Sequence, residues 1–371
     1  MFQTTSGIED EELAEARKLI GEKVRLPELF NTIATRESIR HFAYGCGDDN
    51  PLWCDKAYAR EHGHDRIMAP PTYLYSVFPP GVCPAFPGLQ GFHAGSRWEF
   101  ETPVLEDEQI DVSAELDDIK DVMGKRSGRT LIMCGRTEYR DTNGRLLAVN
   151  HSKTFRKPRP GSPGGLKVER PRFQPSESEI EAIENEIVSY RRRGAEPRYG
   201  DSVTVGEALP RRLKGPLVIE DIIAFAMAIG NVMSGELAVK NRHFYRQHPE
   251  QAPTHRPLGW LLERVPPAAG HMNPDVAKAV GMPAVYDNGW LRMCWMGQFV
   301  TDWMGDAGRL RVLDVRLRLP NLVGDLLKIT GEVVSVSPGQ DSTRVELAIR
   351  AHRQDDELSC HGTATVELPH R

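Results

Sequence analysis

A long run of apolar residues is missing from this chain of 371 residues. A membrane-spanning helix needs about 18 such residues in succession, so we expect no membrane segment. The first residues are acidic and helix-forming, unlike a secretory signal. The 6 cysteines lie far apart without a CxxC pair. That pattern argues against structural zinc and a disulfide framework, and it favours a cytoplasmic protein with reduced thiols.

A surplus of basic residues is also missing. The chain has 47 Lys and Arg against 52 Asp and Glu, for a net charge of −5, whereas nucleic-acid binding normally needs clustered positive charge. The histidines His243, His248 and His255 have spacings that fit neither adjacent helical turns nor a usual zinc motif. We therefore expect no nucleic-acid partner and no metal.

A segment rich in proline and glycine, residues 157–175, divides the chain. Neither a helix nor a central strand fits it, because prolines remove backbone donors and glycines are costly to order. Ser176 and Glu179 then have the spacing of a capping box, and the apolar residues that follow predict a helix ending near Gly194. The predicted division is an N-terminal domain at 1–156, a linker with a helix at 157–200, and a C-terminal domain at 201–371.

The two halves repeat each other. The string FAYGCGD from Phe42 returns as FAMAIGN from Phe225, 183 residues later. Gly63 returns as Gly281, 218 residues later, so the second copy carries an insertion between these landmarks. Repeats of this length indicate two similar domains rather than a solenoid.

Each half ends in four strand-like segments. Apolar and polar residues alternate between Ser96 and Phe155, and again between Leu310 and Leu368, with turn residues such as Thr142-Asn143-Gly144 between the runs. A sheet with one apolar face needs a cover, and a helix is the natural one. We predict an α+β fold in which two antiparallel sheets pair edge to edge, because this would bury their open edges.

The string FAYGCGDDNPLWCDKAYAREHG, from Phe42 to Gly63, resembles the signature of the MaoC-like, or (R)-specific enoyl-CoA hydratase, family in its double hot dog form. The resemblance covers nearly the whole chain as two tandem units. It implies that a sheet wraps a central helix in each half, with the helices beginning near Pro71 and Gly289. In this family an Asp and a His five residues later hold a water that adds to a 2-enoyl thioester. A backbone N–H at the start of the central helix stabilises the thioester oxygen.

The first half departs from this pattern at two positions. Asp48 takes the place of the family's Asp, but Trp53 replaces the His, and an indole cannot shuttle protons. Pro71 replaces the turn glycine and removes the amide that would face the oxyanion. We therefore interpret Asp48 as structural, and by resemblance this half receives the acyl group and part of the CoA arm.

The second half keeps more of the pattern. His271 falls on the family's catalytic His and Gly289 on its turn glycine, whereas Asn231 stands at the Asp position. Asparagine cannot accept a proton, although it can hold a water. Asp287, two residues before Gly289, is a substitute base, the cap of the following helix, or both.

Three functions fit these residues. The leading hypothesis is hydration of a 2-enoyl-CoA, or the reverse dehydration, by a homodimer or hetero-oligomer that needs no cofactor. The alternatives are an acyl-CoA thioesterase that uses Asp287 and a non-catalytic acyl-CoA-binding subunit of a hydratase complex. The predicted catalytic residues are His271, Asp287, Asn231 and Gly289, and the predicted substrate-binding residues are Tyr286, Asn288, Trp290, Asp48, Trp53 and His93.

Overall fold

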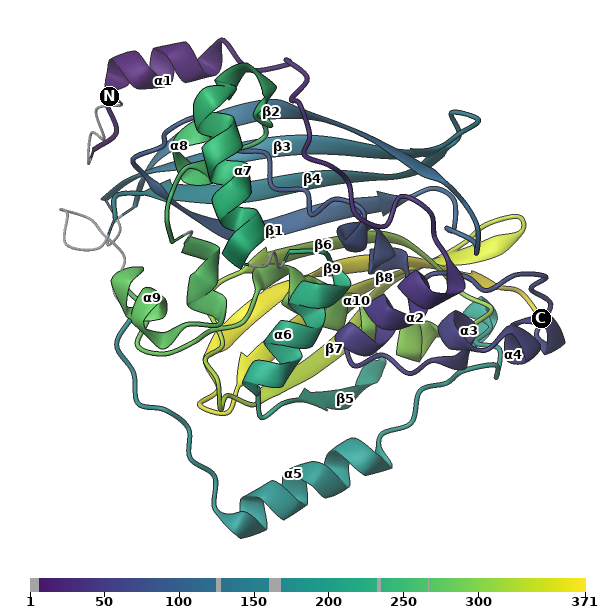
Figure 1. Cartoon of the computed structure of the whole chain (residues 1–371). Coiled ribbons are helices and arrows are strands. Elements are labelled where there is room, and N and C mark those ends of the chain that lie inside the picture. The colour runs from purple at the N-terminus through teal and green to yellow at the C-terminus, as the bar shows by residue number, and fades with distance from the viewer. Residues whose placement is uncertain (1–6, 125–127, 160–167, 232–234, 266) are drawn as a thin grey trace.

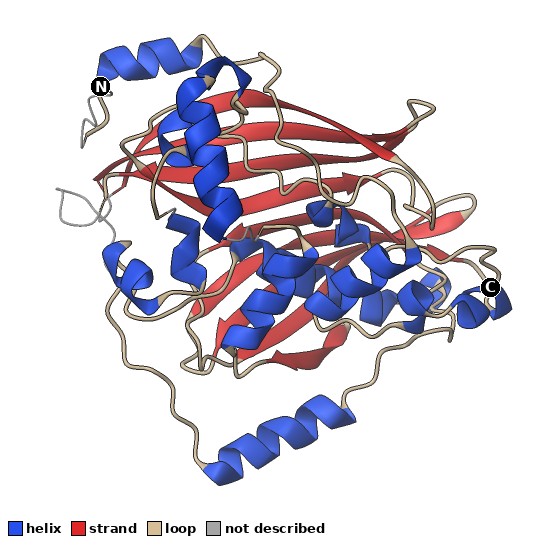
Figure 2. Ribbon diagram, viewed as in Figure 1, coloured by secondary structure: helices blue, strands red, loops and turns tan. Residues whose placement is uncertain are grey.

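The computed structural model describes residues 7–124, 128–159, 168–231, 235–265 and 267–371. One antiparallel sheet of nine strands runs through this part of the chain (Figure 2). Its strand order is β2-β3-β4-β1-β6-β9-β8-β7-β5. The strands are β1 (Gln90–Phe100), β2 (Ile110–Gly124), β3 (Gly128–Asp141), β4 (Leu146–Lys157), β5 (Ala208–Lys214), β6 (Arg309–Leu317), β7 (Leu327–Pro338), β8 (Ser342–Arg353) and β9 (Leu358–Pro369).

The sheets of the two halves join through β1 and β6, which confirms the predicted edge-to-edge pairing. Trp98 lies opposite Leu313 in this antiparallel register. Gly95 makes the close approach possible, because its φ is +130° and a Cβ there would lie 2.1 Å from the carbonyl oxygen of Val315. The junction removes one open edge from each half.

The helices lie mainly on one side of this sheet (Figure 1). None in the described ranges is long and apolar enough to cross a membrane. The α-helices are α1 (Asp10–Arg17), α2 (Arg36–Gly45), α3 (Pro51–Cys54), α4 (Lys56–Glu61), α5 (Glu177–Ser189), α6 (Ile219–Ala228), α7 (Gly235–Gln247), α8 (Leu258–Leu261), α9 (Pro274–Ala279) and α10 (Gly289–Met304). Short 3₁₀ helices are η1 (Pro71–Ser76), η2 (Gly200–Ser202), η3 (Pro249–Gln251) and η4 (Pro267–His271).

The central helix of the second half, α10, begins at Gly289 as predicted. It packs against β6 and β9 of its own half, and also against β1 of the first half. The aromatic stripe along it is buried, as its helical spacing indicates. Its members are Trp290, Trp295, Phe299 and Trp303.

The first half has only the 3₁₀ helix η1 at the corresponding position. It begins at Pro71 as predicted, but it ends after six residues. Four prolines follow within a few residues, and their missing N–H groups and fixed φ prevent an α-helix from continuing. These are Pro79, Pro80, Pro84 and Pro87.

The internal duplication is visible in the packing of α2 against α6. These helices carry the two repeated strings, and the equivalent residues Gly45 and Ala228 meet where they cross. A Cβ at Gly45 would lie 2.7 Å from Cβ of Ala228 and 3.0 Å from the carbonyl oxygen of Ala224. Glycine at position 45 therefore sets how closely the halves approach.

The linker helix α5 begins at the predicted capping box, in which Ser176 and Glu179 bond reciprocally. Its one buried residue, Ile183, packs beside β5 with Leu213. The preceding linker residues 160–167 lie outside the described residues. Arg170 then ties the chain to the second half through Asp325.

One strand, β5, was missed by the sequence analysis. It is a short edge strand whose register shifts between Leu209 and Arg212. It contains Pro210, which is tolerated because an edge strand has one unpaired side. The prolines and arginines hide the alternation that revealed the other strands.

Substitution of Gly45 by Ala should lower the free energy of unfolding by about 1–3 kcal/mol, because the new methyl group overpacks the crossing of α2 and α6. Urea unfolding measures this change. The matched control is Gly235→Ala at the start of α7, where a Cβ meets nothing within 4 Å. Equal stability of the two variants would contradict this account of the interface.

Candidate active site

The candidate site forms around the first turn of α10. The N-cap of this helix is Asn288, whose side-chain oxygen accepts from the Trp290 amide at 2.9 Å. The amides of a first turn have no acceptor within the helix, and they point toward any anion placed there. Asn288, which we predicted to bind substrate, therefore caps α10. One interpretation had given this capping role to Asp287.

His271 stands beside the segment that leads into α10. Its Nδ1 lies 3.1 Å from the carbonyl oxygen of Tyr286, and the two rings are 4.5 Å apart. A carbonyl oxygen can only accept, so Nδ1 carries the proton and Nε2 keeps its lone pair. The backbone thus holds His271 in the tautomer of a proton acceptor.

Strand β1 brings His93 of the first half to the same turn. A Cβ at Gly289 would lie 3.3 Å from both Cβ and Cδ2 of His93, and 2.7 Å from Leu317 Cδ1. The ring of His93 also lies 5.9 Å from that of Trp290. Gly289 therefore leaves room for His93, and residues from both halves meet at the start of α10.

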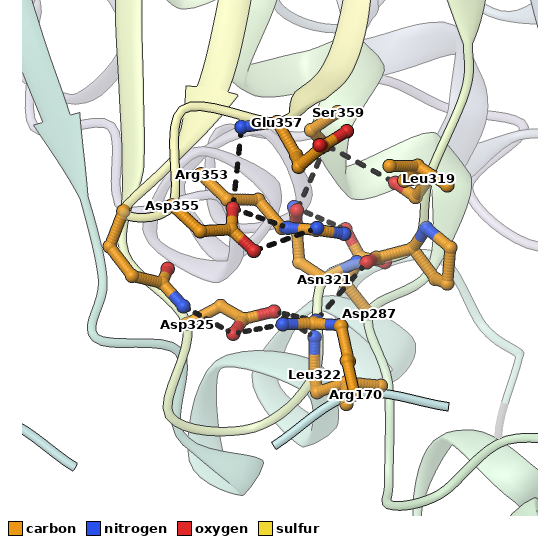
Figure 3. A network of polar contacts seen from close by, with 12 residues as sticks. Arg170, Asp287, Leu319, Asn321, Leu322, Asp325, Arg353, Asp355, Glu357 and Ser359 are labelled. Atoms are coloured by element: carbon orange, nitrogen blue, oxygen red, sulfur yellow. Dashed lines mark hydrogen bonds and ion pairs between the residues drawn. The ribbon is translucent and has the colours of Figure 1, made fainter. Parts of the chain in front are cut away.

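Asp287 points into a buried network (Figure 3). Its carboxylate lies 2.7 Å from Nε of Arg292. It also accepts from the Asn321 backbone amide at 3.2 Å and from Asn321 Nδ2 at 2.9 Å. Ser359 extends this hydrogen-bond network by donating to Asn321 Oδ1 at 2.9 Å. Both oxygens are occupied and the side chain is fully buried, so this carboxylate is engaged by the protein rather than presented to a reacting group.

Burial dominates the protonation of these groups. It lowers the pKa of His271 to about 4 and that of His93 to about 3, and the nearby charge of Arg292 acts in the same direction. Burial raises the pKa of Asp287 to about 6, against the opposing charge of Arg292. At neutral pH the site therefore holds two uncharged imidazoles beside an ion pair.

Three predicted residues of the second half remain. Besides its contacts with His271, Tyr286 packs in the core, as Trp290 does, whereas Asn231 lies elsewhere. Tyr286 is buried, and its backbone pairs with Leu322. Trp290 is buried, and its Nε1 has no partner among the described residues. Asn231 lies half-buried after α6, with its amide bonded to the carbonyl of Ala226. No hydrogen bond within the described ranges joins it to His271.

In the first half, Asp48 and Trp53 form a buried pair. Trp53 Nε1 donates to Asp48 Oδ2 at 3.1 Å, and the Asn50 amide donates to Oδ1 at 3.1 Å. The indole thus occupies the position expected for an imidazole without offering a proton acceptor. This geometry agrees with a structural Asp48 that supports the following turn.

The same signature fastens the halves together. The carbonyl oxygen of Cys46 accepts from Trp295 at 3.1 Å, and that of Gly47 accepts from Gln298 at 3.1 Å, both on α10. Lys214 of β5 donates to Gln298 Oε1 at 2.6 Å, and burial lowers its pKa to about 7. Through these contacts, the signature residues of the first half hold α10 in position.

Comparisons with known sequences find relatives for the first half of the chain. The FAS1-like, dehydratase domain region matches residues 19–149. A UPF0336 protein from Parafrankia sp. is 34% identical over 121 residues, which cover 30% of this chain and 76% of the relative. The 3-oxo-4,17-pregnadiene-20-carboxyl-CoA hydratase beta subunit from Mycobacterium tuberculosis is 30% identical over 101 residues, which cover 27% of this chain and 73% of that subunit.

Solved structures extend the likeness to the whole chain. A MaoC-like dehydratase superimposes with a TM-score of 0.65 at 18% identity, over 95% of this chain and 99% of the other. The chain belongs to the MaoC-like hot dog dehydratase family. A second protein, from Mycobacterium tuberculosis and described as having a double hotdog fold, superimposes with a TM-score of 0.52 at 11% identity, over 94% of this chain and 96% of that one.

Arg292 is the residue of this MaoC-like site that the sequence analysis missed. It donates through Nη1 to the carbonyl oxygens of Leu319 at 2.7 Å and Ser359 at 3.2 Å, while it pairs with Asp287. A signal was present, because Arg292 is an isolated cation in an otherwise apolar stretch of α10. Buried charges of this kind are normally paired, so it predicted a buried acid nearby.

The buried histidine His255 of this hot dog protein should make stability depend on pH. Burial lowers its pKa from 6.5 to about 3, so the unfolded chain binds a proton that the native one rejects. The contribution of His255 to the free energy of unfolding is fully present above its pKa in the unfolded chain. It is lost as the pH falls toward its pKa in the folded chain, at about 1.4 kcal/mol per pH unit.

Replacement of His255 by Phe should remove that contribution, because the ring stacks edge-on against Phe78 and its Nδ1 has no partner among the described residues. The slope of unfolding free energy against pH, measured in urea below pH 6.5, should become shallower than in the unmodified protein. An unchanged slope would contradict a buried, uncharged His255.

Proposed function

We propose that this MaoC-like protein reversibly hydrates a 2-enoyl-CoA thioester, with chemistry at the start of α10. His271 Nε2 takes a proton from water as the water oxygen bonds to C3 of the substrate. The electrons of the double bond move onto the thioester oxygen, which the Gly289 N–H stabilises. The imidazolium then returns the proton to C2, so one residue serves as base and then as acid.

The observation that carries this proposal is the tautomer of His271. Its Nδ1 is engaged by the carbonyl oxygen of Tyr286, which lies three residues before Gly289 in the sequence. This contact leaves Nε2 unprotonated. A depressed pKa keeps that nitrogen uncharged at neutral pH. His93 packs over Gly289 from the first half, and we infer that it orients the thioester there. Asn231 as a holder of water stays a prediction.

The thioesterase alternative receives less support. It requires a carboxylate aimed at water beside the helix start, whereas the Asp287 carboxylate is buried against Arg292 and Asn321. We infer that Asp287 positions the backbone before Gly289 through the hydrogen bond that its backbone N–H donates to the carbonyl oxygen of Asn321. We further propose that the second half carries the catalytic residues and that the first half contributes to substrate binding.

A single assay separates these functions. Crotonyl-CoA and longer or branched 2-enoyl-CoA thioesters are incubated with the purified protein, while enoyl absorbance and release of free CoA are followed together. Hydration removes the absorbance without releasing CoA. Release of CoA would instead identify a thioesterase, and binding without turnover would identify a subunit that lacks activity alone.

Substitution of His271 by Ala should lower the hydration rate by about 10²–10⁴, the usual contribution of general acid–base catalysis. The control is Trp53→Phe, which removes the donor to Asp48 but no proton acceptor. Thermal unfolding is measured for both variants to confirm that they fold. Full activity of the His271 variant together with loss in the Trp53 variant would place the chemistry in the other half.

The acid side of the pH profile supplies a second check. The free-enzyme pH dependence of kcat/KM should fall with a pKa near 4, the value to which burial lowers His271, because protonation removes the base. An ordinary exposed histidine would give a fall near 6.5. The measurement is kcat/KM across this range, with enzyme stability verified at each pH.

A further inference from the structure

We propose that Arg156 and Arg256 form a subsite for a carboxylate at the far end of the acyl group, so that the preferred ligands are ω-carboxyacyl thioesters. This inference rests on the function proposed above and names its substrate class. Arg156 comes from β4 of the first half, and Arg256 comes from the insertion that distinguishes the second half.

Arg156 is a fully buried cation with spare donors. Its Nη2 donates to the carbonyl oxygens of Ala85 and Phe86, and the guanidinium lies 4.0 Å from the ring centre of Trp260. Its Nε and Nη1 have no partner within the described residues. Burial of a cation is costly unless an anion compensates it, and the contacts of Arg156 are neutral carbonyls and an aromatic face.

Arg256 is the second uncompensated cation. Desolvation lowers its pKa, and the described part of the chain offers it no hydrogen bond or ion pair. Glu263, whose charge acts on Arg156, is paired with Arg159. Among the described residues neither arginine forms an ion pair with an acid, although the chain carries more acidic than basic residues.

The two guanidinium groups share one environment. The charges of both arginines act on the pKa of the Cys83 thiol, and the backbone N–H of Cys83 donates to the carbonyl oxygen of His255, the residue before Arg256, at 2.7 Å. Buried ring nitrogens without described partners belong to residues that neighbour these arginines, and a bound oxyanion would accept hydrogen bonds from the indole N–H groups among them. They are Trp260 Nε1, Trp290 Nε1 and His255 Nδ1.

The cluster borders the candidate active site along two lines of contact. At Gly81, a Cβ would lie 3.5 Å from Trp290 and 3.9 Å from Arg256 Nη2. At Gly91, a Cβ would lie 3.0 Å from Arg156 Nη1 and 2.6 Å from Trp260. Gly91 is two residues before His93 on β1, and Trp290 follows Gly289 on α10. The arginines are therefore adjacent to the candidate site, and we infer that an acyl group whose thioester lies at Gly289 extends toward them.

Burial favours the acyl end over CoA as the source of the anion. The phosphates of CoA are strongly hydrated and lie at the end of a long, flexible arm, whereas Arg156 has no exposed surface. A carboxylate is planar and accepts two parallel bonds from a guanidinium fork. A residue from the insertion would then set the preference for substrate while His271 and Gly289 carry out the chemistry.

Calorimetric titration with saturated thioesters tests the subsite without turnover, because these ligands have no double bond to hydrate. Glutaryl-CoA is compared with pentanoyl-CoA, and adipoyl-CoA with hexanoyl-CoA. The diacid thioester of at least one pair should bind about tenfold more tightly or better, as a charge-assisted bond predicts. Arg256→Gln should abolish that preference and leave affinity for the monoacid thioesters within about twofold.

The matched control is Arg159→Gln, which removes an exposed arginine paired with Glu263 and should preserve the preference. Arg156→Met tests the second cation if it folds, and Arg256→Gln carries the test if it does not. Equal affinity for diacid and monoacid thioesters would overturn the subsite while the proposed hydratase stands.

Loss of affinity for both thioester types in Arg256→Gln would assign the arginine to the CoA phosphates and would also overturn the proposal. Dephospho-CoA thioesters then identify which phosphate is bound. Failure of every acyl-CoA to bind the unmodified protein would remove the proposed function together with the subsite.

Discussion

The pairing of β1 with β6 is the constraint on which the site depends. It can form because Gly95 takes a backbone conformation closed to other residues and brings β1 against the carbonyl of Val315. The register of β1 shifts between His93 and Gly95, directly before this contact. The junction therefore does more than close two open edges: it places His93 of one repeat against Gly289 of the other.

The duplicated signature has been put to different uses in the two repeats. In the first, Asp48 and Trp53 form a closed pair, and the neighbouring carbonyl groups hold Trp295 and Gln298 of α10. In the second, His271 keeps a free ring nitrogen beside the helix start. The first copy thereby holds the helix at whose start His271 of the second copy lies.

The buried charged residues of the molecule differ in whether they are paired. Arg292 and Asp287 compensate each other within a network that includes Asn321 and Ser359, so this pair orients the backbone before α10. Within the described residues, Arg156 and Arg256 form no ion pair with an acid. An unpaired buried cation such as Arg156 is expensive, so we propose that these two arginines bind a ligand, whereas the pair of Arg292 and Asp287 has a structural role.

The sequence by itself determined the repeats, eight of the nine strands, the capping box of α5 and the start of α10, because these follow from local periodicity and turn chemistry. It also singled out His271 and Gly289 as the residues of the second half that match the family's catalytic His and turn glycine. It could not decide between the roles of Asp287, since a carboxylate before a glycine suits a base and a cap equally. Only the tertiary structure showed that Asn288 is the cap and that Arg292 and Asn321 enclose the acid. The neighbours of His93 and of the two uncompensated arginines were equally hidden, because they come from segments far apart in the chain that meet only when the sheets join.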